Sequence, residues 1–321
     1  MPEVSVVVPS HARPLRLRWL LNALEEQTLT PERWEVVVVH DDPGERTERA
    51  LVAHGFGDEG RLRRIWLAAG TGSPARQRNT GWRAARGPLV AFTDDDCRPE
   101  PGWLEQLLSA AQEHPHAIVQ GATRPDPYEA EVIPFTPRAR TITVDPPGLF
   151  AQTCNILYPR AALERAGGFD ETMPAPAGED TDLALRVRAL GTPYVGAPGA
   201  IVNHAVETYS LPAMIRVAWK WQHLAYVVRR HPQLRRNVPL GLFWRSTHAW
   251  ALGGALTAQV LPRRLALLAF APYLRALMPF AGRSPRRWLR RLAELPSRAL
   301  VDLAELVALA WGSVRYRTPF L

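Results

Sequence analysis

Short apolar runs alternate with helix-like stretches along the first part of this chain, and this alternation constrains its fold more than any other feature. The apolar runs lie at residues 4–8, 36–39, 64–67 and 89–92, and the clearest helix-like stretches at 15–27 and 103–112. Short strand-type runs that alternate with helices are the pattern of βαβ units. The sequence therefore predicts an α/β domain with a mainly parallel sheet flanked by helices.

Further elements are expected beyond residue 110. Residues 117–119, 150–158, 194–195 and 200–202 read as strands. A helix is predicted from residue 179, with Leu183, Val187 and Leu190 as its apolar stripe, and Gly191 ends it. Trp103 begins an amphipathic helix after Pro101 and Gly102, so we expect its side chain in the core rather than at a ligand-binding surface.

Three consecutive aspartates, Asp94, Asp95 and Asp96, follow the fourth apolar run. Ligands of open α/β sheets collect beyond the carboxyl ends of the strands, so a buried strand that leads into acids brings oxygen ligands to that crevice. Such ligands suit Mg²⁺ or Mn²⁺ held against a diphosphate. The alternative is a solvated acidic turn, which is the commoner interpretation of an isolated triplet.

Two other segments bear on that choice. The basic stretch 72–87, which holds Arg78 and Asn79, leads straight into the same strand, and arginines are natural partners of phosphates. Glu179 and Asp180 stand at the start of the helix predicted from residue 179. Acids at that position also stabilise a helix through its dipole, so an ordinary N-terminal charge remains the alternative for Glu179.

Composition limits the class of protein. With 321 residues, 46% of them hydrophobic, the chain can form one or two domains with a sizeable core. Its two cysteines, Cys97 and Cys154, make neither a disulfide framework nor a Cys/His metal spacing, which fits a reducing cytoplasm. We expect no amino-terminal signal, because the first apolar run is short and precedes Pro9.

The net charge of +8 is divided unevenly along the chain. Residues 1–210 hold 21 basic and 28 acidic side chains, whereas residues 211–321 hold 18 basic and three acidic ones, so the two parts carry −7 and +15. This asymmetry predicts two domains, 1–210 and 211–321, that face different partners.

The second part mixes basic, aromatic and strongly apolar segments, the longest apolar ones being 239–262 and 265–279. This mixture favours a membrane interface over nucleic acid, for which no recognised module is present. Within residues 211–321, the longest stretch without a charged residue is 246–262, whose 17 residues are at the lower limit of the roughly 17–25 that span a bilayer. We therefore expect interfacial or re-entrant helices. Spanning helices, and a helical pack against the first domain or a partner, remain the alternatives.

Six segments of the first part, in order, resemble the nucleotide-sugar-dependent glycosyltransferases of family 2, which have the GT-A fold. The segments lie at 4–14, 35–42, 78–81, 92–99, 167–171 and 178–183. The resemblance covers roughly residues 1–210. It implies a GT-A catalytic domain, a nucleotide-sugar donor and a divalent cofactor, Mg²⁺ or Mn²⁺.

The resemblance also implies roles for individual residues. Asp94 and Asp96 match the family's DxD motif, and Asp96, its last acid, is the expected metal ligand. Asp180 matches the general base, and Glu179 would position it or contact the acceptor. The residues expected to bind the donor are Pro9, His11, Arg13, Asp41, Arg78, Asn79, Asp94 and Asp95.

One segment departs from the family pattern. The second strand of relatives commonly ends Val-Asp-Asp-Gly-Ser, whereas this chain reads Val39-His40-Asp41-Asp42-Pro43. His40 thus replaces the first acid, and Asp42 takes the position of the glycine. We assign the contact with the nucleotide base to Asp41, with Asp42 as the alternative, and the identity of the base stays open.

Two further residues have two interpretations each. His204 follows the apolar run 200–202, and some relatives place a metal- or phosphate-contacting histidine near here; the alternative is a polar residue that caps a strand. Asn155 could bond a sugar hydroxyl of the acceptor, or it could satisfy nearby backbone groups.

The chemistry of sugar transfer accounts for these residue types. Departure of a nucleoside diphosphate needs charge stabilisation, and attack by a hydroxyl needs a base on the opposite face of the sugar, which predicts inversion. We therefore expect an inverting, metal-dependent transferase that acts on a lipid-linked or envelope-glycan acceptor, held peripherally at the cytoplasmic face of the cell membrane or integrated in it. The alternative is a non-catalytic scaffold of the same fold that binds sugar nucleotides at the membrane.

Overall fold

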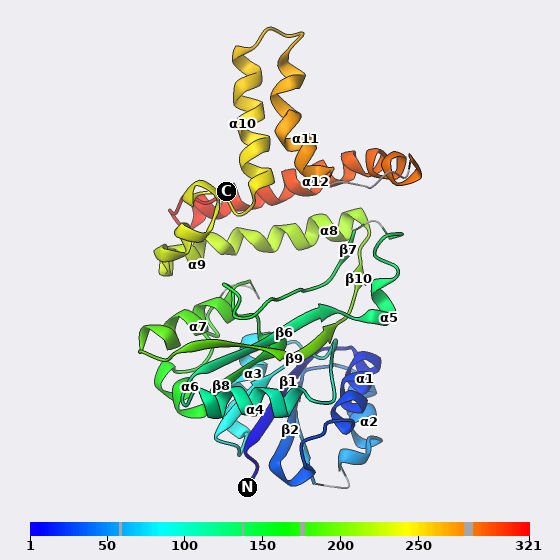
Figure 1. Cartoon of the computed structure of the whole chain (residues 1–321), viewed down its shortest axis with the longest axis vertical. Helices are drawn as coiled ribbons and strands as arrows, with labels where there is room; N and C mark the ends of the chain where they lie inside the picture. Colours follow the sequence, from blue (N-terminus) through cyan, green and yellow to red (C-terminus); the bar gives the residue numbers. More distant parts are fainter. Residues whose placement is uncertain (58–59, 137, 174–176, 279–284) are drawn as a thin grey trace. The chain divides into compact units, whose positions relative to one another are not determined.

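The computed structural model describes residues 1–57, 60–136, 138–173, 177–278 and 285–321 (Figure 1). The chain divides into two compact units, Met1–Glu207 and Thr208–Leu321. Residue 279, which ends the second apolar stretch expected from the sequence, lies outside the described residues.

The first unit is built on an eight-stranded sheet with helices on both faces (Figure 1). Its strands are β1 (Val4–Ser10), β2 (Trp34–His40), β3 (Leu62–Trp66), β4 (Leu89–Phe92), β5 (Cys97–Pro99), β6 (Ile118–Pro125), β8 (Ile156–Pro159) and β9 (Tyr194–His204), in the spatial order β3-β2-β1-β4-β8-β6-β9-β5. Its helices are α1 (Pro14–Glu25), α2 (Arg46–Val52), α3 (Pro74–Ala84), α4 (Trp103–Glu113), α5 (Pro127–Ala130), α6 (Arg160–Ala166) and α7 (Glu179–Ala189). Short elements complete the chain trace: η1 (Pro31–Arg33), η2 (Gly55–Gly57), η3 (Thr153–Asn155), β7 (Ala139–Arg140) and β10 (Glu207–Thr208).

The expectation of a mainly parallel sheet is confirmed only in part, because the sheet is mixed. Strands β3, β2, β1 and β4 are parallel, as the βαβ pattern predicts, and β6 is parallel to β9. However, β8 is antiparallel to both of its neighbours, β4 and β6, and β5 is antiparallel to β9. A parallel connection needs a crossover, usually through a helix. Among the described residues between β6 and β8, the chain forms α5, the two-residue strand β7 and the 3₁₀ turn η3, and none of these is a crossover helix of the usual length. Strand β8 enters the sheet in the opposite direction.

The apolar runs of β1 and β2 are buried throughout because both faces of the sheet are covered. Val36 and Val38 pack with the leucines of α1 and α4 on one face, and Val37 and Val39 pack with Trp82 of α3 on the other. Gly81 of α3 lies so close to the sheet that an added Cβ would be 2.4 Å from Cγ1 of Val7. Small size at residue 81 therefore sets how closely α3 approaches β1.

Three expectations about single elements need correction. Residues 150–158 do not form one strand, because Thr153–Asn155 is a 3₁₀ turn and only Ile156–Pro159 pairs in the sheet. The runs at 194–195 and 200–202 belong to one continuous strand, β9. The apolar stripe of α7 ends at Val187, since Leu190 is 49% exposed.

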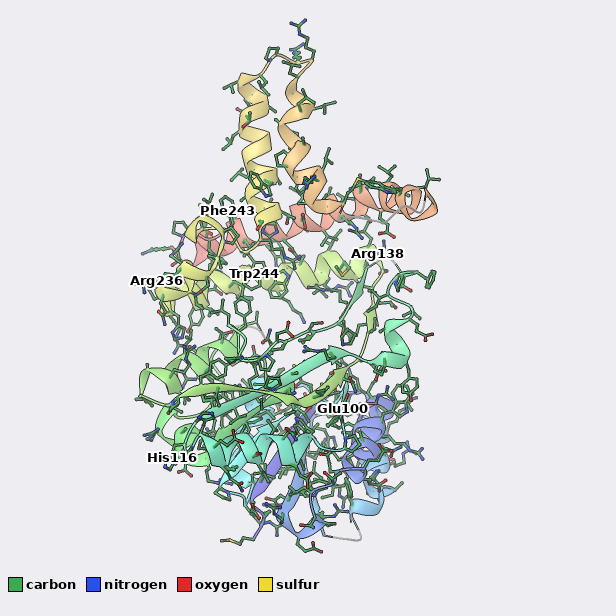
Figure 2. The ribbon with its side chains drawn as sticks, in the orientation of Figure 1. Glu100, His116, Arg138, Arg236, Phe243 and Trp244 are labelled. Carbon is green, nitrogen blue, oxygen red and sulfur yellow. The ribbon has the colours of Figure 1, made fainter. Side chains whose placement is uncertain are left out.

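The second unit is helical and has its own small core. Its elements are α8 (Leu211–Ala218), η4 (Trp219–His223), α9 (Leu224–Arg230), η5 (Pro232–Asn237), η6 (Pro239–Gly241), α10 (Ser246–Val260), η7 (Ala266–Phe270), α11 (Ala271–Leu277) and α12 (Pro285–Arg315). Leu224 and Val228 of α9 pack with Leu309 of α12 and Phe320. Figure 2 labels Phe243 and Trp244 in the segment before α10, where the Trp244 backbone N–H donates to the carbonyl of Leu321 at 2.5 Å. The carboxyl end of the chain is thereby bonded within this unit.

Helices α10 and α11 run side by side as a hairpin in the second unit (Figure 1). Several of its large apolar side chains are solvent-exposed, including Val260 at 83%, Leu267 at 81% and Leu268 at 65%. Within the described ranges, every helix falls short of the length or the apolar content that crossing a membrane requires.

Candidate active site

A cleft lies beyond the carboxyl ends of β1 and β4, where an open α/β sheet is expected to bind its ligand. Eight residues singled out in the sequence line it together: Pro9, His11, Arg13, Arg78, Asp94, Asp95, Asp96 and His204. The remaining lining residues are Ser10, Pro74 and Gln77. Segments that are far apart in the sequence thus meet at one place, so an isolated acidic turn does not describe the aspartate triplet.

Asp95 holds the loop that follows β1. Its Oδ2 accepts the hydroxyl of Ser10 at 2.8 Å and the backbone N–H of His11 at 3.3 Å, and its Oδ1 lies 3.5 Å from Nη1 of Arg13. The carboxyl is almost fully buried, and this burial together with the neighbouring Asp96 raises the pKa of Asp95 to about 7. Asp95 therefore shapes the floor of the cleft from within the protein.

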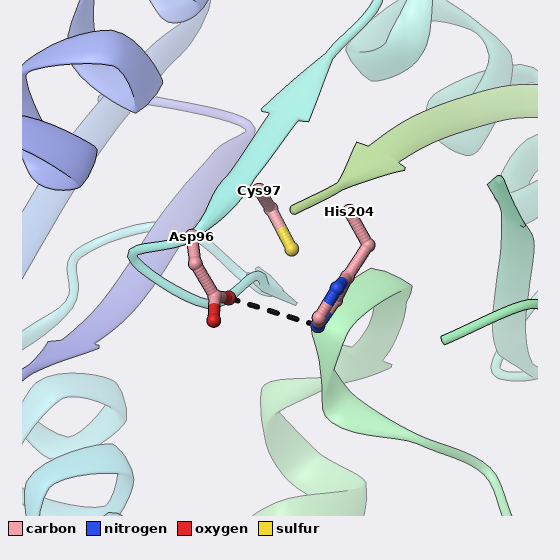
Figure 3. Close-up of side chains that lie close together, drawn as sticks. All are labelled: Asp96, Cys97 and His204. Atoms are coloured by element: carbon pink, nitrogen blue, oxygen red, sulfur yellow. Dashed lines mark ion pairs between the residues drawn. The ribbon is translucent and has the colours of Figure 1, made fainter. Parts of the chain in front are cut away.

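Asp96 faces the cleft between a guanidinium and an imidazole. Nη1 of Arg13 donates to Oδ2 of Asp96 at 2.5 Å, and Nε2 of His204 lies 3.7 Å from Oδ1 (Figure 3). Burial raises the pKa of Asp96. The thiol of Cys97 completes a group whose ligand atoms all lie within 4.8 Å of one another, but burial raises the pKa of Cys97 far above its usual value, so this sulfur stays protonated.

His204 is held in one orientation by the backbone. Its Nδ1 lies 2.8 Å from the carbonyl oxygen of Ala205, which can only accept, so Nδ1 carries the proton and donates. The lone pair of Nε2 is then left free on the side of Asp96. A metal-binding histidine commonly donates its other ring nitrogen in this way, which fixes the tautomer and the direction of the ring. A bond to the neighbouring backbone also fits a polar residue that caps a strand, so both interpretations of His204 remain open.

Arg78 connects the two acidic clusters that the sequence singled out. Its Nη2 donates to Oδ1 of Asp94 at 2.9 Å, while Nη1 lies 3.2 Å from Oε1 of Glu179 and 3.5 Å from Oδ1 of Asp180. The side chain of Arg78 is only 6% exposed, and the three carboxylates raise its pKa. One buried cation, which itself lines the cleft, thus joins the aspartate triplet to the pair Glu179 and Asp180.

Asp180 begins α7 and keeps part of its carboxylate accessible, with 21% of the side chain exposed. Its Oδ2 accepts the backbone N–H of Thr153 at 3.1 Å. Burial, followed by repulsion from Glu179, raises the pKa of Asp180 well above the usual range of an aspartate. A raised pKa and a partly open face suit a group that takes a proton near neutral pH.

The structure separates the two candidates for the contact with the nucleotide base. Both oxygens of Asp42 serve the local turn, accepting the N–H of Gly44 at 3.0 Å and the hydroxyl of Thr47 at 2.7 Å, and the Thr47 bond lowers the pKa of Asp42. Asp41 instead lies 2.7 Å from Nδ1 of the exposed His11, and it accepts the Gln77 amide at 3.0 Å. Asp41 is thus joined to cleft-lining residues, whereas Asp42 stabilises the start of α2.

Asn79 lies outside the lining residues and bonds within the protein. Its Nδ2 donates to the carbonyl of Phe169 at 2.8 Å and to Glu171 at 2.7 Å. Its Oδ1 accepts the indole N–H of Trp82 and the backbone N–H of Phe169, both at 2.9 Å. The side chain therefore ties α3 to residues 169–171.

The backbone-satisfying alternative for Asn155 is confirmed. The buried amide donates to the carbonyls of Ala122 at 2.7 Å and Ala200 at 2.8 Å, and it accepts the indole N–H of Trp103 at 2.8 Å. Trp103 itself is fully buried, so its expected place in the core is confirmed as well. A bond between Asn155 and a sugar hydroxyl does not fit this environment.

Four contacts of the site involve residues that the sequence did not single out. Ser10 and Thr153 bond to Asp95 and Asp180, and Gln77 joins Asp41 to the backbone of Ser10. Glu207 accepts from Nη2 of Arg13 at 2.9 Å. Ser10 and Gln77 lie inside segments that resemble the family or adjoin Arg78, so their neighbourhood was a usable signal. Glu207 is 194 residues from Arg13, and no local pattern indicates that pairing.

The fold and this cleft define the class of protein: a GT-A glycosyltransferase fold. A mannosyltransferase from Pyrobaculum calidifontis, PcManGT, solved in complex with GDP-Man and Mn²⁺, superposes with a TM-score of 0.55 at 22% identity, covering 98% of this chain and 87% of that one. TarS 1–349 of S. aureus, in complex with UDP-GlcNAc, gives 0.53 at 18% identity, covering 99% and 93%. At these identities the likeness concerns the fold.

Sequence comparison places the chain within that class. The family model "Glycosyl transferase family 2" matches residues 5–167, and the chain belongs to this family. A validoxylamine A glucosyltransferase of Streptomyces hygroscopicus subsp. limoneus is 28% identical over 292 residues, which cover 81% of this chain and 63% of the relative. A pre-mycofactocin glycosyltransferase of Mycobacterium tuberculosis is 32% identical over 189 residues, covering 56% of this chain and 39% of the relative. The chain thus spans less than two thirds of the length of these relatives.

Proposed function

We propose that this chain is an inverting, metal-dependent glycosyltransferase that moves a sugar from a nucleotide-sugar donor to an acceptor hydroxyl. The observation that carries this proposal is the position of Arg78 between Asp94 on one side and Glu179 and Asp180 on the other. Arg78 thus brings Asp94, which suits a metal bound to a diphosphate, close to Asp180, which suits the role of general base. Relatives named as glycosyltransferases and solved neighbours with GDP-Man or UDP-GlcNAc support the same chemistry.

The residues present fit a divalent cation. Asp96 and Asp94 offer hard oxygen ligands, and His204 presents an oriented imidazole nitrogen. An imidazole ligand suits Mn²⁺ better than Mg²⁺, although either ion fits the carboxylates. Such an ion, when bound, offsets the negative charge that develops on the departing diphosphate. We therefore assign Asp96 as the principal metal ligand, with Asp94 and His204 beside it.

The donor is assigned to the face of the cleft that Pro9, His11, Arg13 and Arg78 line, with Asp41 bonded to His11. Arg13 is 43% exposed, so its guanidinium can turn from Asp96 toward phosphate oxygens at little cost. Asp41 contacts the nucleotide base, with His11 beside it. Asp95 supports donor binding indirectly, because it holds the loop that carries His11 and Arg13. Asn79 likewise acts indirectly, because it holds residues 169–171.

The base is assigned to Asp180, with Glu179 and Arg78 holding it in place. In its ionised form the carboxylate accepts the proton of the acceptor hydroxyl as the hydroxyl oxygen bonds to the anomeric carbon and the bond to the diphosphate breaks. A single in-line displacement of this kind reverses the configuration at that carbon. General-base assistance contributes about 10²–10⁴-fold in rate.

We assign catalysis to residues 1–210 and membrane docking to residues 211–321. The +15 charge of the second segment and the exposed apolar residues of the α10–α11 hairpin support peripheral binding at the inner face of the cell membrane. An acceptor that is lipid-linked, or part of the cell envelope, would be available there.

The test is a thermal-shift panel of UDP-, GDP- and dTDP-sugars, with and without Mn²⁺ or Mg²⁺, on the wild type and on Asp96→Ala. We expect one donor to raise the Tm of the wild type only when metal is present, and to leave the variant unchanged. Transfer assays on Asp180→Asn then separate catalysis from binding: donor binding persists while transfer is lost. Binding of a donor without any transfer by the wild type would support the scaffold alternative, and absence of any shift would contradict both.

A further inference from the structure

A second cluster of metal-binding side chains lies in the helical unit, apart from the residues of the cleft. His248 belongs to the first turn of α10, and Asp302 and Glu305 are three residues apart on α12. Residues at i and i+3 share one face of a helix, so both carboxylates point to the same side of α12. One ligand atom from each of the three residues lies within 4.8 Å of the others.

The burial of this cluster is unusual for charged groups. The side chain of His248 is completely buried, that of Glu305 is 1% exposed, and Asp302 is 7% exposed. Carboxylates are rarely buried to this degree unless they are paired or bind a metal. Desolvation of two acids next to each other therefore requires positive charge at the same place.

Polar atoms of the cluster lack hydrogen-bond partners among the described residues. These atoms are both ring nitrogens of His248, Oδ2 of Asp302 and Oε2 of Glu305. The carboxylate of Asp302 also has the hydroxyls of Thr247 and Tyr273 beside it. Buried polar groups without a partner are rare, because each costs about 1–3 kcal/mol. A fully buried imidazole whose nitrogens form no hydrogen bond, placed against two buried carboxylates, is an arrangement that a metal ion would satisfy.

An ion cluster without metal is the competing explanation. Nε of Arg245 lies 3.1 Å from Oε2 of Glu305, and Nε2 of His248 lies 3.3 Å from the same oxygen. A protonated His248 together with Arg245 would balance the two carboxylates. However, neither contact has hydrogen-bonding geometry, since Oε2 of Glu305 remains without a bond partner, and a protonated imidazole would be expected to donate to it.

We propose that His248, Asp302 and Glu305 bind a structural divalent transition metal, with Zn²⁺ as the preferred ion, that joins α10 to α12. One imidazole and two carboxylates are ligands that Zn²⁺ accepts, and the hydroxyl of Thr247 or a water completes four-coordination. The deep burial of all three side chains fits a closed, structural site. The site is independent of sugar transfer, and it would fix the base of the α10–α11 hairpin.

The experiment measures metal content in the full chain, prepared without a polyhistidine tag and with Asp96→Ala to remove the principal ligand in the cleft. After treatment with EDTA and dialysis against Zn²⁺, we expect about one zinc per chain by plasma mass spectrometry. His248→Gln on the same background is expected to abolish that zinc. Co²⁺ in place of Zn²⁺ should give visible absorption bands that His248→Gln removes.

Two variants serve as matched controls. His223→Gln changes another buried histidine of the helical unit, whose Nδ1 lies 2.7 Å from the hydroxyl of Tyr316, and it should leave the zinc content unchanged. Glu305→Gln keeps the shape of the side chain but removes its charge, and it should lower zinc affinity while circular dichroism shows a folded chain. Equal zinc content in the His248→Gln and His223→Gln proteins, or no zinc in the Asp96→Ala protein, would overturn the proposal.

Discussion

Arg78 is the residue on which the geometry of the cleft most depends. Its planar fork reaches three carboxylates from one buried position, and a lysine ammonium is a point charge that cannot reproduce this arrangement. We expect Arg78→Lys to lower kcat/KM about 100-fold, the size of effect that a misplacement of about 1 Å can cause. Steady-state kinetics measure this effect. Arg76→Lys, which changes an exposed arginine of the same helix, should stay near the wild-type value.

The pH dependence of transfer reports on Asp180. The carboxylate works as a base only when ionised, so the rate should fall as the pH is lowered through its pKa. Because burial and Glu179 raise that pKa, the fall should occur well above the value of about 3.9 typical of aspartate. A profile of kcat/KM against pH measures it. A rate that stays constant down to pH 4 would contradict the assignment of Asp180 as the base.

Single residues show both the strength and the limit of prediction from sequence. Seven of the eight cleft residues could be named because they lie in segments that resemble the family, and His204 because it follows the apolar run 200–202. The hydrogen-bond partners of these residues could not be predicted from the sequence. Ser10 bonds to Asp95, 85 residues further along the chain, and Arg13 bonds to Glu207, which is 194 residues further along. Asn155 could not be decided in advance, since its three bonds depend on β6, β9 and α4 packing around it.

At the scale of elements, the approach of α3 to β1 has a measurable consequence. Gly81→Ala would place a methyl group 2.4 Å from Cγ1 of Val7, so α3 must move away from the sheet. Overpacking of this kind costs about 1–3 kcal/mol, which exceeds the roughly 1 kcal/mol that alanine contributes to a helix. Thermal denaturation should show a lower Tm.

Gly253→Ala in α10 is the control for that substitution. An added Cβ at residue 253 meets nothing within 4 Å, so the better helix propensity of alanine acts alone and stability should not fall. If both substitutions changed the Tm in the same direction, the close contact between Gly81 and Val7 would not be what sets the position of α3.

Elements with a clear hydrophobic pattern could be predicted from the sequence. Elements whose direction or conformation depends on neighbouring segments could not. The first four strands read clearly because β1 and β2 are buried on both faces. The direction of β8 depends on the connection that precedes it, and residues 150–158 are apolar enough to resemble a strand while Thr153–Asn155 turns. Apolar content alone does not distinguish these cases.

At the scale of the whole molecule, the uneven charge predicts binding to anionic membranes. We expect the full chain to sediment with vesicles that contain phosphatidylglycerol, and to do so less at high salt, because ions screen the attraction. Leu267→Glu combined with Leu268→Glu should weaken binding, since both side chains are exposed on the hairpin segment. Val52→Glu, which alters an equally exposed side chain of the first unit, should bind like the wild type. Equal binding by all three proteins would exclude the hairpin as the contact.

The burial of Asp95 and Asp96 makes the cleft a place where cations and protons compete. Burial raises the pKa of Asp95 to about 7 and also raises that of Asp96, so part of the carboxylate charge is neutralised near pH 7, and a cation entering beside them would expel those protons. By reciprocity, the affinity for the cation must rise with pH over the interval in which Asp95 ionises, near pH 7. Titration calorimetry in buffers of different ionisation enthalpy would count the protons released. A small change of pH near neutrality would thereby change the fraction of molecules in which a cation occupies this cleft.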